Sequence, residues 1–495
     1  MRRRLAPAAL LLAAGCAMGP SYRRPEIAPA GAAVGLAPAA DSVRAFYDSM
    51  AAATDSGRGT PLPPPARLEG DSADVAWLEV LQDPTLLALV RTAVAENRDV
   101  QTAAARIREF RAEVGIARSG LFPELTANAS ASTNQIALGA LPPQSFEALR
   151  ITGDLAWELD FWGRLRRGVQ AASADLGAEE AGYRATLLTL VGDVAQTYLA
   201  ILELRQEEAI AERTLASRRS TLGLARERFR SGVISELDVR QFEAEVAVPA
   251  ASLAQARRLR SAREHQLAAL VGRLPFPVPD GSDLTAAVRR IEVPDSIPAT
   301  LLGRRPDVRR AERAYAAATA RVGVAQAARY PRVSIGGYYG TQSPETDRLF
   351  GGNAEVYQLQ GGVSIPLFTG GRLANEARAS EARAEQARLG FEQTVLQAFR
   401  EASDALVGVR TARDQRVAQE AQVVALRKAA ELADLRYRGG VASYLEVLDA
   451  QRQLFGAELG LSQSQLLELS SAVLLYRALG GSWTEGATAA AGPPR

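Results

Sequence analysis

The chain has 495 residues, of which 47% are hydrophobic, 23% charged and only 6% aromatic. This composition allows a large folded core and favours closely packed helices. The 58 basic and 56 acidic residues give a formal net charge of +2, so no overall field attracts nucleic acid. One cysteine, Cys16, and one histidine, His265, leave little for disulfides, zinc clusters or nucleophilic catalysis. Composition therefore argues against an enzyme, against a multi-cysteine zinc site and against most histidine-based metal sites.

The N-terminus is typical of a secretory signal. Three arginines follow Met1, and a short apolar run then leads to Gly15-Cys16. The run is too short to span a bilayer. The residues Ala13-Ala14-Gly15-Cys16 resemble a bacterial lipobox, although Leu is usual where Ala13 stands. This pattern predicts a signal peptide over residues 1–15 and a lipid on the Cys16 thiol. The alternative is a cysteine that simply lies within a signal peptide.

The segments outside the two main units are poor in helix and strand signals. Residues 16–72 are rich in Pro, Gly and Ala, which predicts an extended, lipid-anchored N-terminal segment. The tail 483–495 is small and polar, and we expect it to be frayed. Beyond the signal we find no apolar run near ~20 residues, so we predict no transmembrane helix.

Short motifs recur along the chain at one fixed spacing of 208 residues. Chance matches would not share a single offset over such a distance, so the chain contains two copies of one long unit. We place the units at residues 73–274 and 299–482, joined by a Pro-rich linker at 275–298. The pairs with this spacing include Asp99-Val100 and Asp307-Val308, Val114-Gly115 and Val322-Gly323, Phe122-Pro123 and Tyr330-Pro331, Gly163-Arg164-Leu165 and Gly371-Arg372-Leu373, and Gly272 and Gly480.

Both units have the same predicted layout. Residues 85–121 and 304–329 have a helical pattern, and each is followed by two segments of alternating residues. Very long helices are then predicted over 165–229 and 373–437, because neither stretch contains Pro. After a turn, a last helix runs to Gly272 or Gly480.

The long helices carry an apolar stripe with coiled-coil spacing, although an ordinary core-facing stripe would look the same. Their length is more informative, because 65 residues reach roughly 98 Å at ~1.5 Å per residue. Such a helix suits a tube or a long spacer and not a compact domain. The stripe consists of Tyr183, Leu187, Val191, Val194, Tyr198 and Ile201 in the first unit, and of Phe391, Val395, Phe399, Ala402, Leu406 and Val409 in the second.

The four alternating segments suggest strands with one apolar and one polar face. In one of them Leu155 and Trp157 alternate with Asp154, Glu158 and other polar residues. Two hairpins on a soluble core would explain this pattern, but acidic residues on the polar face favour a water-filled lumen and lipid on the other side. Four strands cannot close a membrane barrel, and an open edge cannot face lipid. If these strands span a membrane, several chains must therefore share a barrel, and three chains would supply 12 strands.

These features together resemble the TolC-like outer-membrane factor family, in its NodT-type or OprM-like lipoprotein branch. The resemblance covers almost the whole chain after the signal. It includes short motifs in a characteristic order, which are Gly19-Pro20-Ser21-Tyr22-Arg23-Arg24-Pro25, Asp83-Pro84, Asn97-Arg98-Asp99, Leu121-Phe122-Pro123, Phe161-Trp162-Gly163 and Arg304-Arg305-Pro306-Asp307.

The resemblance implies a mainly α-helical homotrimer with a 12-stranded membrane β-barrel and a long α-helical barrel that crosses the periplasm. It also implies an outer-membrane channel of a tripartite efflux system, partnered by a periplasmic adaptor and an RND-type inner-membrane pump. The pump supplies the energy, so the resemblance implies no catalytic residue and no cofactor besides the lipid on Cys16. The alternatives are the exit duct of a type I protein secretion system and a periplasmic adaptor or spacer lipoprotein.

Each unit has a turn between its last two helices, at 232–235 and at 440–443. Gly permits a tight reversal there, and Ser is a good N-cap for the next helix, so a structural role explains these residues. The resemblance implies in addition that the turns form the periplasmic tip and contact the adaptor. The residues concerned are Gly232, Val233, Ser235, Gly440, Val441 and Ser443.

Acidic residues follow both turns. Asp238 lies after the first turn, and Glu446 and Asp449 lie three residues apart after the second. A favourable interaction with a helix N-terminus is one explanation. The resemblance implies a threefold-repeated acidic ring that narrows the closed pore, in which like charges repel and attract cations. Arg228 and Arg436 precede the turns and are candidates to pair with these acids, or else are solvated surface residues.

Overall fold

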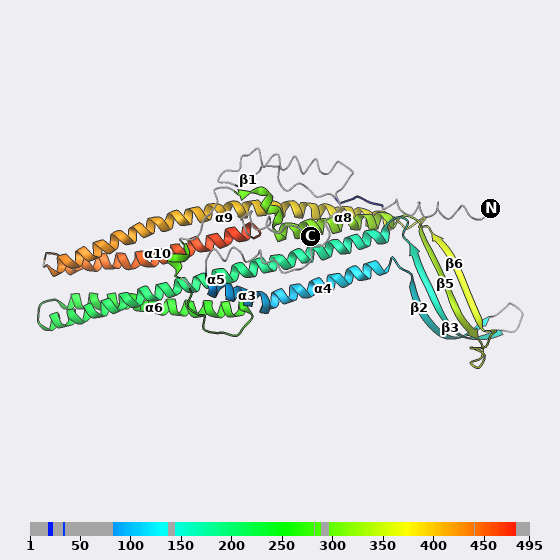
Figure 1. The fold of residues 1–495 in the computed structure, drawn as a ribbon, viewed down its shortest axis with the longest axis horizontal. Helices are drawn as coiled ribbons and strands as arrows, with labels where there is room; N and C mark the ends of the chain where they lie inside the picture. Colours follow the sequence, from blue (N-terminus) through cyan, green and yellow to red (C-terminus); the bar gives the residue numbers. More distant parts are fainter. Residues whose placement is uncertain are drawn as a thin grey trace, which may run out of the picture.

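The computed structural model describes residues 18–22, 33–34, 83–136, 144–281, 283–288, 297–439 and 441–481. The predicted signal peptide, Cys16 and the predicted tail lie outside these residues. The described part is a long helical rod with a four-stranded sheet at one end (Figure 1). The prediction of a mainly helical protein with a small sheet is therefore confirmed.

The two repeats contain matching elements. The first has α3 (Pro84–Glu96), α4 (Arg98–Ser119), β2 (Glu124–Ile136), β3 (Gln144–Leu159), α5 (Arg164–Arg230) and α6 (Glu236–Val271). The second has the 3-10 helix η3 (Ala299–Arg304), α8 (Pro306–Ala327), β5 (Arg332–Ser343), β6 (Glu355–Ser364), α9 (Arg372–Arg438) and α10 (Tyr444–Ala478). Helices α5 and α9 each have 67 residues, which confirms the two very long helices.

The first helical segment is broken in a way that the sequence pattern did not predict. Asn97 is extended, with φ −63° and ψ 133°, and separates α3 from α4. Its side chain accepts hydrogen bonds from the amides of Asp99 and Val100 at 2.9 and 3.1 Å. Because Asn caps a new helix, the chain changes direction here. In the second repeat the break comes at Arg305, before Pro306 at the first position of α8.

In both repeats, equivalent contacts join the end of the last helix to the residue that precedes α4 or α8. Asn97 donates to the carbonyl of Leu270 at 2.9 Å, and Arg305, which is 208 residues later, donates to the carbonyl of Ala478 at 2.8 Å. Gly272 has φ +82°, and a Cβ atom there would lie 2.5 Å from the Glu96 carbonyl oxygen. The end of the last helix therefore approaches the backbone before α4 closely, and only glycine fits this contact.

The apolar stripes of the long helices are the core of the rod. Val191, Val194, Tyr198 and Ile201 of α5 are buried against α3 and α10. Phe391 and its neighbours on α9 form a second cluster with α10. In the sequence we found no long apolar run beyond the signal. This is corrected here, since α5 contains an 18-residue stretch apolar enough, by length and composition, to cross a membrane. That stretch is 56% buried within the protein, as for a core helix.

The Pro-rich linker packs against the core. It contains a short helix, α7 (Leu284–Val288), whose Leu284 and Val288 side chains are buried in the α5 cluster. Arg205 of α5 donates to the carbonyls of Val278 and Pro279 at 2.6 and 3.0 Å. Further along, β4 (Ile297–Pro298) pairs with β1 (Ala33–Val34) of the N-terminal segment. These contacts tie the linker to the middle of the rod.

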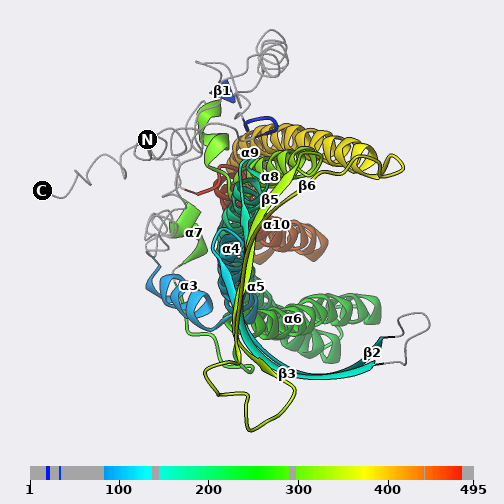
Figure 2. The same ribbon diagram turned by 90° about the vertical axis from the view of Figure 1, so that its right-hand side faces the viewer.

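The four long strands form one antiparallel sheet in the order β2-β3-β5-β6. The sheet joins the two repeats directly, because β3 of the first repeat pairs with β5 of the second. Figure 2 views the rod along its length and shows that the sheet is curved and that α9, α5 and α6 follow an open arc. Within the described residues, neither the sheet nor the helices of one chain close into a tube.

Candidate functional site

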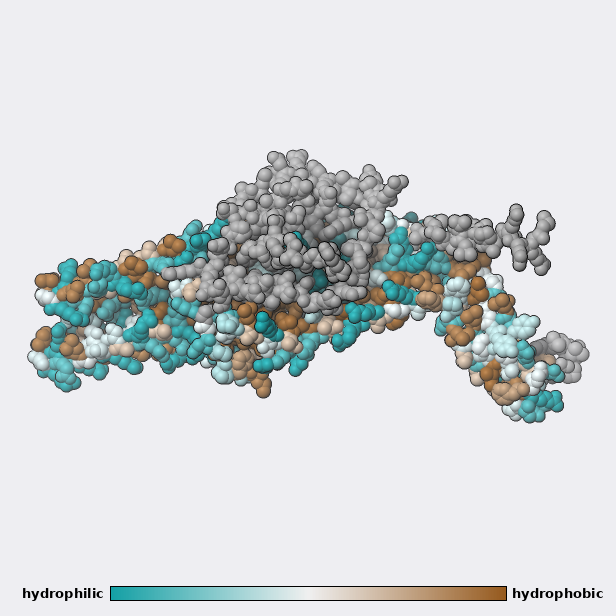
Figure 3. Space-filling model, viewed as in Figure 1, coloured by the Kyte–Doolittle hydropathy of each residue, from teal (hydrophilic) through white to brown (hydrophobic). Residues whose placement is uncertain are grey.

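The strand register places the predicted apolar residues on one face of the sheet. Leu125 is opposite Leu155, which is opposite Gly337, which is opposite Leu359. Leu125 and Leu359 are 76% and 77% exposed, so nothing within the described chain covers this row. Figure 3 shows hydrophobic residues along the sheet. The same face carries Ala127, Ala129, Ala131, Ile151, Gly153, Trp157, Leu159, Val333, Ile335, Tyr339, Tyr357, Gly361 and Val363.

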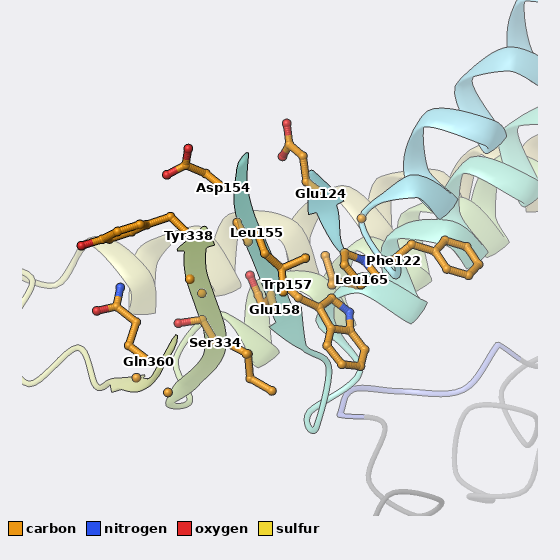
Figure 4. Close-up of a pocket in the computed structure, with 18 of the residues that line it drawn as sticks. Phe122, Glu124, Asp154, Leu155, Trp157, Glu158, Leu165, Ser334, Tyr338 and Gln360 are labelled. Carbon is orange, nitrogen blue, oxygen red and sulfur yellow. The ribbon is translucent and has the colours of Figure 1, made fainter. Parts of the chain in front are cut away.

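The opposite face of the sheet is polar. Thr126, Asp154, Tyr338 and Gln358 form a row across all four strands. Asp154 accepts hydrogen bonds from Asn128 at 3.0 Å and from Thr152 at 2.8 Å. Near the helices, Glu158 pairs with Arg164 at 2.7 Å. Figure 4 shows Asp154, Tyr338 and Gln360 lining the hollow at this end of the sheet together with apolar side chains such as Leu155 and Trp157.

The two edges of the sheet are open. In the part of the chain that the structure describes, β2 pairs only with β3, and β6 pairs only with β5. Each edge therefore presents backbone amides and carbonyls without a strand partner. Within lipid such groups cost several kcal/mol each, so an apolar sheet of this kind needs further strands at both edges.

An exposed aromatic residue marks each of the four junctions between sheet and helices. Phe122, Phe161, Tyr330 and Phe368 follow α4, β3, α8 and β6. Their exposed fractions range from 39% for Tyr330 to 91% for Phe368. Aromatic side chains prefer the interface between lipid and water, so this level is the expected edge of a membrane. All four residues therefore mark one level along the length of the rod.

The far end of the rod consists of the two predicted turns (Figure 1). Gly232 has φ +74°, and the amide of Val233 donates to the Arg228 carbonyl at 2.9 Å. The amide of Val441 makes the equivalent bond to the Arg436 carbonyl at 3.0 Å. Gly440 lies outside the described residues. Four apolar side chains are exposed near the turns, which are Val233, Leu237, Val441 and Leu445.

The two serines at the turns behave differently. Ser235 and Asp238 form a capping box, in which the Asp238 carboxylate accepts from the Ser235 amide at 2.9 Å and hydroxyl at 2.8 Å. These hydrogen bonds hold the pKa of Asp238 below its usual value. Ser443 begins α10 without a side-chain capping bond. The structural role expected of the turn residues is thus present at Ser235 and weaker at Ser443.

Glu446 and Asp449 lie side by side on an exposed face of α10. They line one shallow groove together with Ser443, Leu445, Leu448 and Arg452. Arg436 pairs with Glu446 at 3.2 Å, as the sequence suggested for an arginine before the turn. Asp449 accepts a hydrogen bond from Gln453 at 2.7 Å. The carboxylates are therefore together and accessible.

Arg228 makes a different contact from the one that the sequence suggested. It donates to the Tyr437 hydroxyl and lies 5.6 Å from that ring. Tyr437, Tyr444 and Phe242 form an aromatic cluster, with ring centroids 5.3 and 4.2 Å apart. Burial raises the pKa of Tyr444 to about 12. This cluster joins the two tip hairpins, since Phe242 lies on α6, Tyr437 on α9 and Tyr444 on α10.

A second link between the hairpins was missed from sequence. Arg452 of α10 pairs with Glu245 of α6 at 3.3 Å. Glu245 also binds the buried Arg218 of α5. Three helices therefore meet at one ionic cluster above the tips, and a change in their packing would move Glu446 and Asp449.

Comparison with known proteins gives this geometry a context. Residues 89–273 and 297–481 each match the outer membrane efflux protein family. Both pairs of bounds are 208 residues apart, which confirms the repeat. The probable efflux pump outer membrane protein TtgC of Pseudomonas putida is 33% identical over 434 residues, covering 85% of this chain and 89% of TtgC. The solvent efflux pump outer membrane protein SrpC of the same species is 34% identical over 435 residues, covering 84% and 90%.

Solved structures agree with the sequence matches. The outer-membrane channel OprN superposes with a TM-score of 0.80 at 29% identity, covering 94% of this chain and all of OprN. The open-state MtrE outer membrane channel of Neisseria gonorrhoeae gives 0.77 at 27% identity, covering 94% and 98%. The chain belongs to the outer membrane efflux protein family and is an outer-membrane exit channel of a tripartite efflux system, which works with a periplasmic adaptor and an inner-membrane pump.

Proposed function

We propose that three copies of this chain form the channel. The observation that carries this proposal is the open sheet. Its exposed apolar face is suited to lipid, but the unpaired backbone groups at its two described edges cannot face lipid. Three four-stranded sheets joined edge to edge give about 12 strands, which lies within the range of closed membrane barrels. The arc of α9, α5 and α6 would close into a helical tube by the same rotation (Figure 2).

Each subunit is anchored by a lipid on Cys16. The support is the lipobox-like sequence and the position of residue 18, which is held at the level of the aromatic junctions. A periplasmic adaptor or spacer would need no such face of lipid-exposed strands. The channel itself uses no catalytic residue and no cofactor, because an RND-type inner-membrane pump drives transport.

The two tips receive the adaptor. Val233, Leu237, Val441 and Leu445 are between 63% and 71% exposed and are equivalent in the two repeats. Three subunits would present six similar apolar contacts around one axis. The turn residues Gly232, Ser235 and Ser443 shape these contacts.

Glu446 and Asp449, with Asp238, form the gate. Their carboxylates are accessible near the tip of the rod, and threefold repetition would bring like charges together. Arg436 neutralises one acid in each subunit, and Arg228 supports the tip through Tyr437. An outward movement of α9 and α10 at the tip would separate the acids and widen the pore.

Native mass spectrometry tests the assembly. The full chain is extracted from outer membranes in mild detergent, and the mass of the complex is measured. The expected result is a trimer with one lipid modification per subunit. A monomer that stays soluble without detergent after removal of the lipid would contradict the shared barrel.

A further inference from the structure

Residues Met18–Tyr22, which we call the strap, lie against both repeats. The amide of Met18 donates to the Trp162 carbonyl at 3.0 Å, just before α5. Four residues later, the Tyr22 hydroxyl donates to Glu312 of α8 at 3.1 Å. The strap therefore connects a residue of the first repeat with a helix of the second.

Arg167, in the first turn of α5, holds the strap by its backbone. Its Nε atom donates to the Met18 carbonyl and its Nη2 atom to the Gly19 carbonyl, both at 3.0 Å. The guanidinium group presents fixed, parallel donors, so two adjacent carbonyls are a good match for it. A third donor, Nη1, binds Gln170, which fixes the orientation of the side chain.

Two glycines allow the strap to approach α8. Gly19 has φ +93°, and a Cβ atom there would lie 2.4 Å from the Cα of Gly323. A Cβ atom on Gly323 would lie 2.8 Å from the Met18 carbonyl oxygen and 3.0 Å from the Arg167 side chain. Side chains at either position would displace the strap. The site formed by Arg167 and Gly323, which we call the seat, therefore accepts only this backbone path.

The end of the strap is fixed by an aromatic contact. The Tyr22 ring packs edge-on against Tyr315, with centroids 5.5 Å apart. It also contacts a cluster of small residues, Ala174 of α5 with Ala316 and Ala317 of α8. The ring thus covers the seam between α5 and α8, and the strap has a fixed point at each end.

The seat lies at the level of the aromatic junctions. Trp162, which accepts the Met18 amide, stacks on Tyr330 with centroids 5.1 Å apart and donates to the Pro331 carbonyl at 2.7 Å. Cys16 precedes Met18 by two residues in the sequence, and two residues span at most about 7 Å. Met18, the first described residue after it, is held near the membrane edge of its own sheet.

We propose that Arg167, Gly323 and the Tyr22 pocket form a docking site for the acylated N-terminus of the same subunit. The site sets the point at which the acyl chains enter the inner leaflet, at the rim of the sheet. Arg167 is a positioning residue and does not touch the lipid. This inference rests on the proposed lipid on Cys16, and it adds that the anchor is fixed in position by the folded channel.

The strap can dock only after the two repeats have packed together. Arg167 and Trp162 belong to the first repeat, and Gly323 and Glu312 to the second, so the seat exists only when α5 and α8 are packed together. The strap then fastens the two repeats at the end of the rod nearest the membrane. Before α5 and α8 pack together, the lipid would anchor the chain to the membrane without fixing its position relative to the sheet.

Hydrogen exchange on the full-length protein in nanodiscs tests the proposal. The amides of Met18, Gly19, Ser21 and Tyr22 are followed by mass spectrometry in wild type, Arg167→Ala, Arg167→Lys and Gly323→Ala, since Pro20 has no amide hydrogen. We expect exchange about tenfold faster or more in Arg167→Ala and Gly323→Ala, because local opening no longer breaks the same contacts. Arg167→Lys keeps one of the two bonds and should lie between them and wild type.

Arg166→Ala is the matched control. Arg166 is the next residue along α5, but it pairs with Asp160 at 3.3 Å and makes no contact with the strap. Its exchange at residues 18–22 should equal that of wild type. Equal protection in wild type and Arg167→Ala, or an equal loss in Arg166→Ala, would overturn the proposal. If Arg167→Ala does not fold, Tyr22→Phe, which loses the bond to Glu312, gives a milder test with the same expected direction.

The intact mass of each sample separates the inference from the function on which it rests. A protected strap on a protein whose Cys16 carries no lipid would refute the anchor while leaving the seat. A lipid on Cys16 with an unprotected strap would refute the docking site while leaving the channel and its anchor.

Discussion

Replacing Glu203 by glutamine is expected to stabilise the helical rod at pH 8 and to remove a pH dependence that the wild type shows. Glu203 lies on α5, is only 5% exposed, and one of its oxygens has no hydrogen-bond partner among the described residues. The Ser462 hydroxyl on α10 is buried beside this carboxyl group. Burial, and then the charge of Glu207, raise the pKa of Glu203 from 4.5 to about 8.

The sign of the effect follows from proton binding. Below pH 4.5 the carboxyl group is protonated in both the folded and the unfolded chain. Between 4.5 and about 8 the unfolded chain releases this proton and the folded chain keeps it, so stability falls as the pH rises. At about 1.4 kcal/mol per pH unit, the loss over this interval is on the order of 5 kcal/mol per chain. Above pH 8 it stays constant.

Thermal unfolding followed by far-UV circular dichroism measures the effect between about pH 5 and pH 9. The Glu203→Gln variant should lose less stability than wild type across this range and should be the more stable of the two at its alkaline end. Glu207→Gln is the companion variant, since removal of the neighbouring charge should move the wild-type transition to lower pH. Parallel pH profiles for wild type and Glu203→Gln would refute the buried neutral carboxyl.

Three further predictions concern the gate, the repeat and the membrane face. Replacing Asp238, Glu446 and Asp449 together by Ala should raise single-channel conductance in planar bilayers and weaken cation preference, and unchanged values would remove the gate assignment. Gly480→Ala should destabilise the protein by about 1–3 kcal/mol, because φ is +73° there and a Cβ atom would lie 2.8 Å from the backbone of Arg305, and an unchanged melting temperature would contradict this close contact. Leu359→Arg should reduce the amount of heat-stable trimer in membranes, at a cost of about 2–4 kcal/mol near the bilayer centre, whereas Gln360→Arg on the polar face should assemble normally, and equal yields would mean that the faces are assigned wrongly.

The repeat, the long helices and the faces of the sheet were predictable because each is a periodic pattern. The offset of 208 residues required matching elements, and alternation over Leu125–Ala131 and its counterparts required one apolar face. Periodicity does not encode where a helix is interrupted. The break at Asn97 depends on one side chain capping the next helix, inside a segment that reads as continuously helical.

Contacts between distant residues were harder to predict. Arg228 precedes a turn followed by acids, yet it binds Tyr437, which is adjacent only after the two hairpins pack. The Pro-rich linker reads as extended, but Leu284 and Val288 bury it against α5. The seat of the strap needs two glycines that are about 300 residues apart and that carry no signal of their contact.

A closed barrel of three subunits requires β6 of one subunit to pair with β2 of the next, because these are the edge strands of the described sheet. The most direct measurement is a scan of cysteine pairs, with one cysteine on β2 between Thr126 and Ser130 and the other on β6 between Val356 and Gln360. The natural chain contains only Cys16, so the introduced pairs can be read without interference from other cysteines in the strands. At least one pair should give a covalently closed trimer on denaturing gels after oxidation of intact outer membranes, and the matching single-cysteine variants should not. Membrane-inserted protein that remains monomeric for every pair would contradict this pairing.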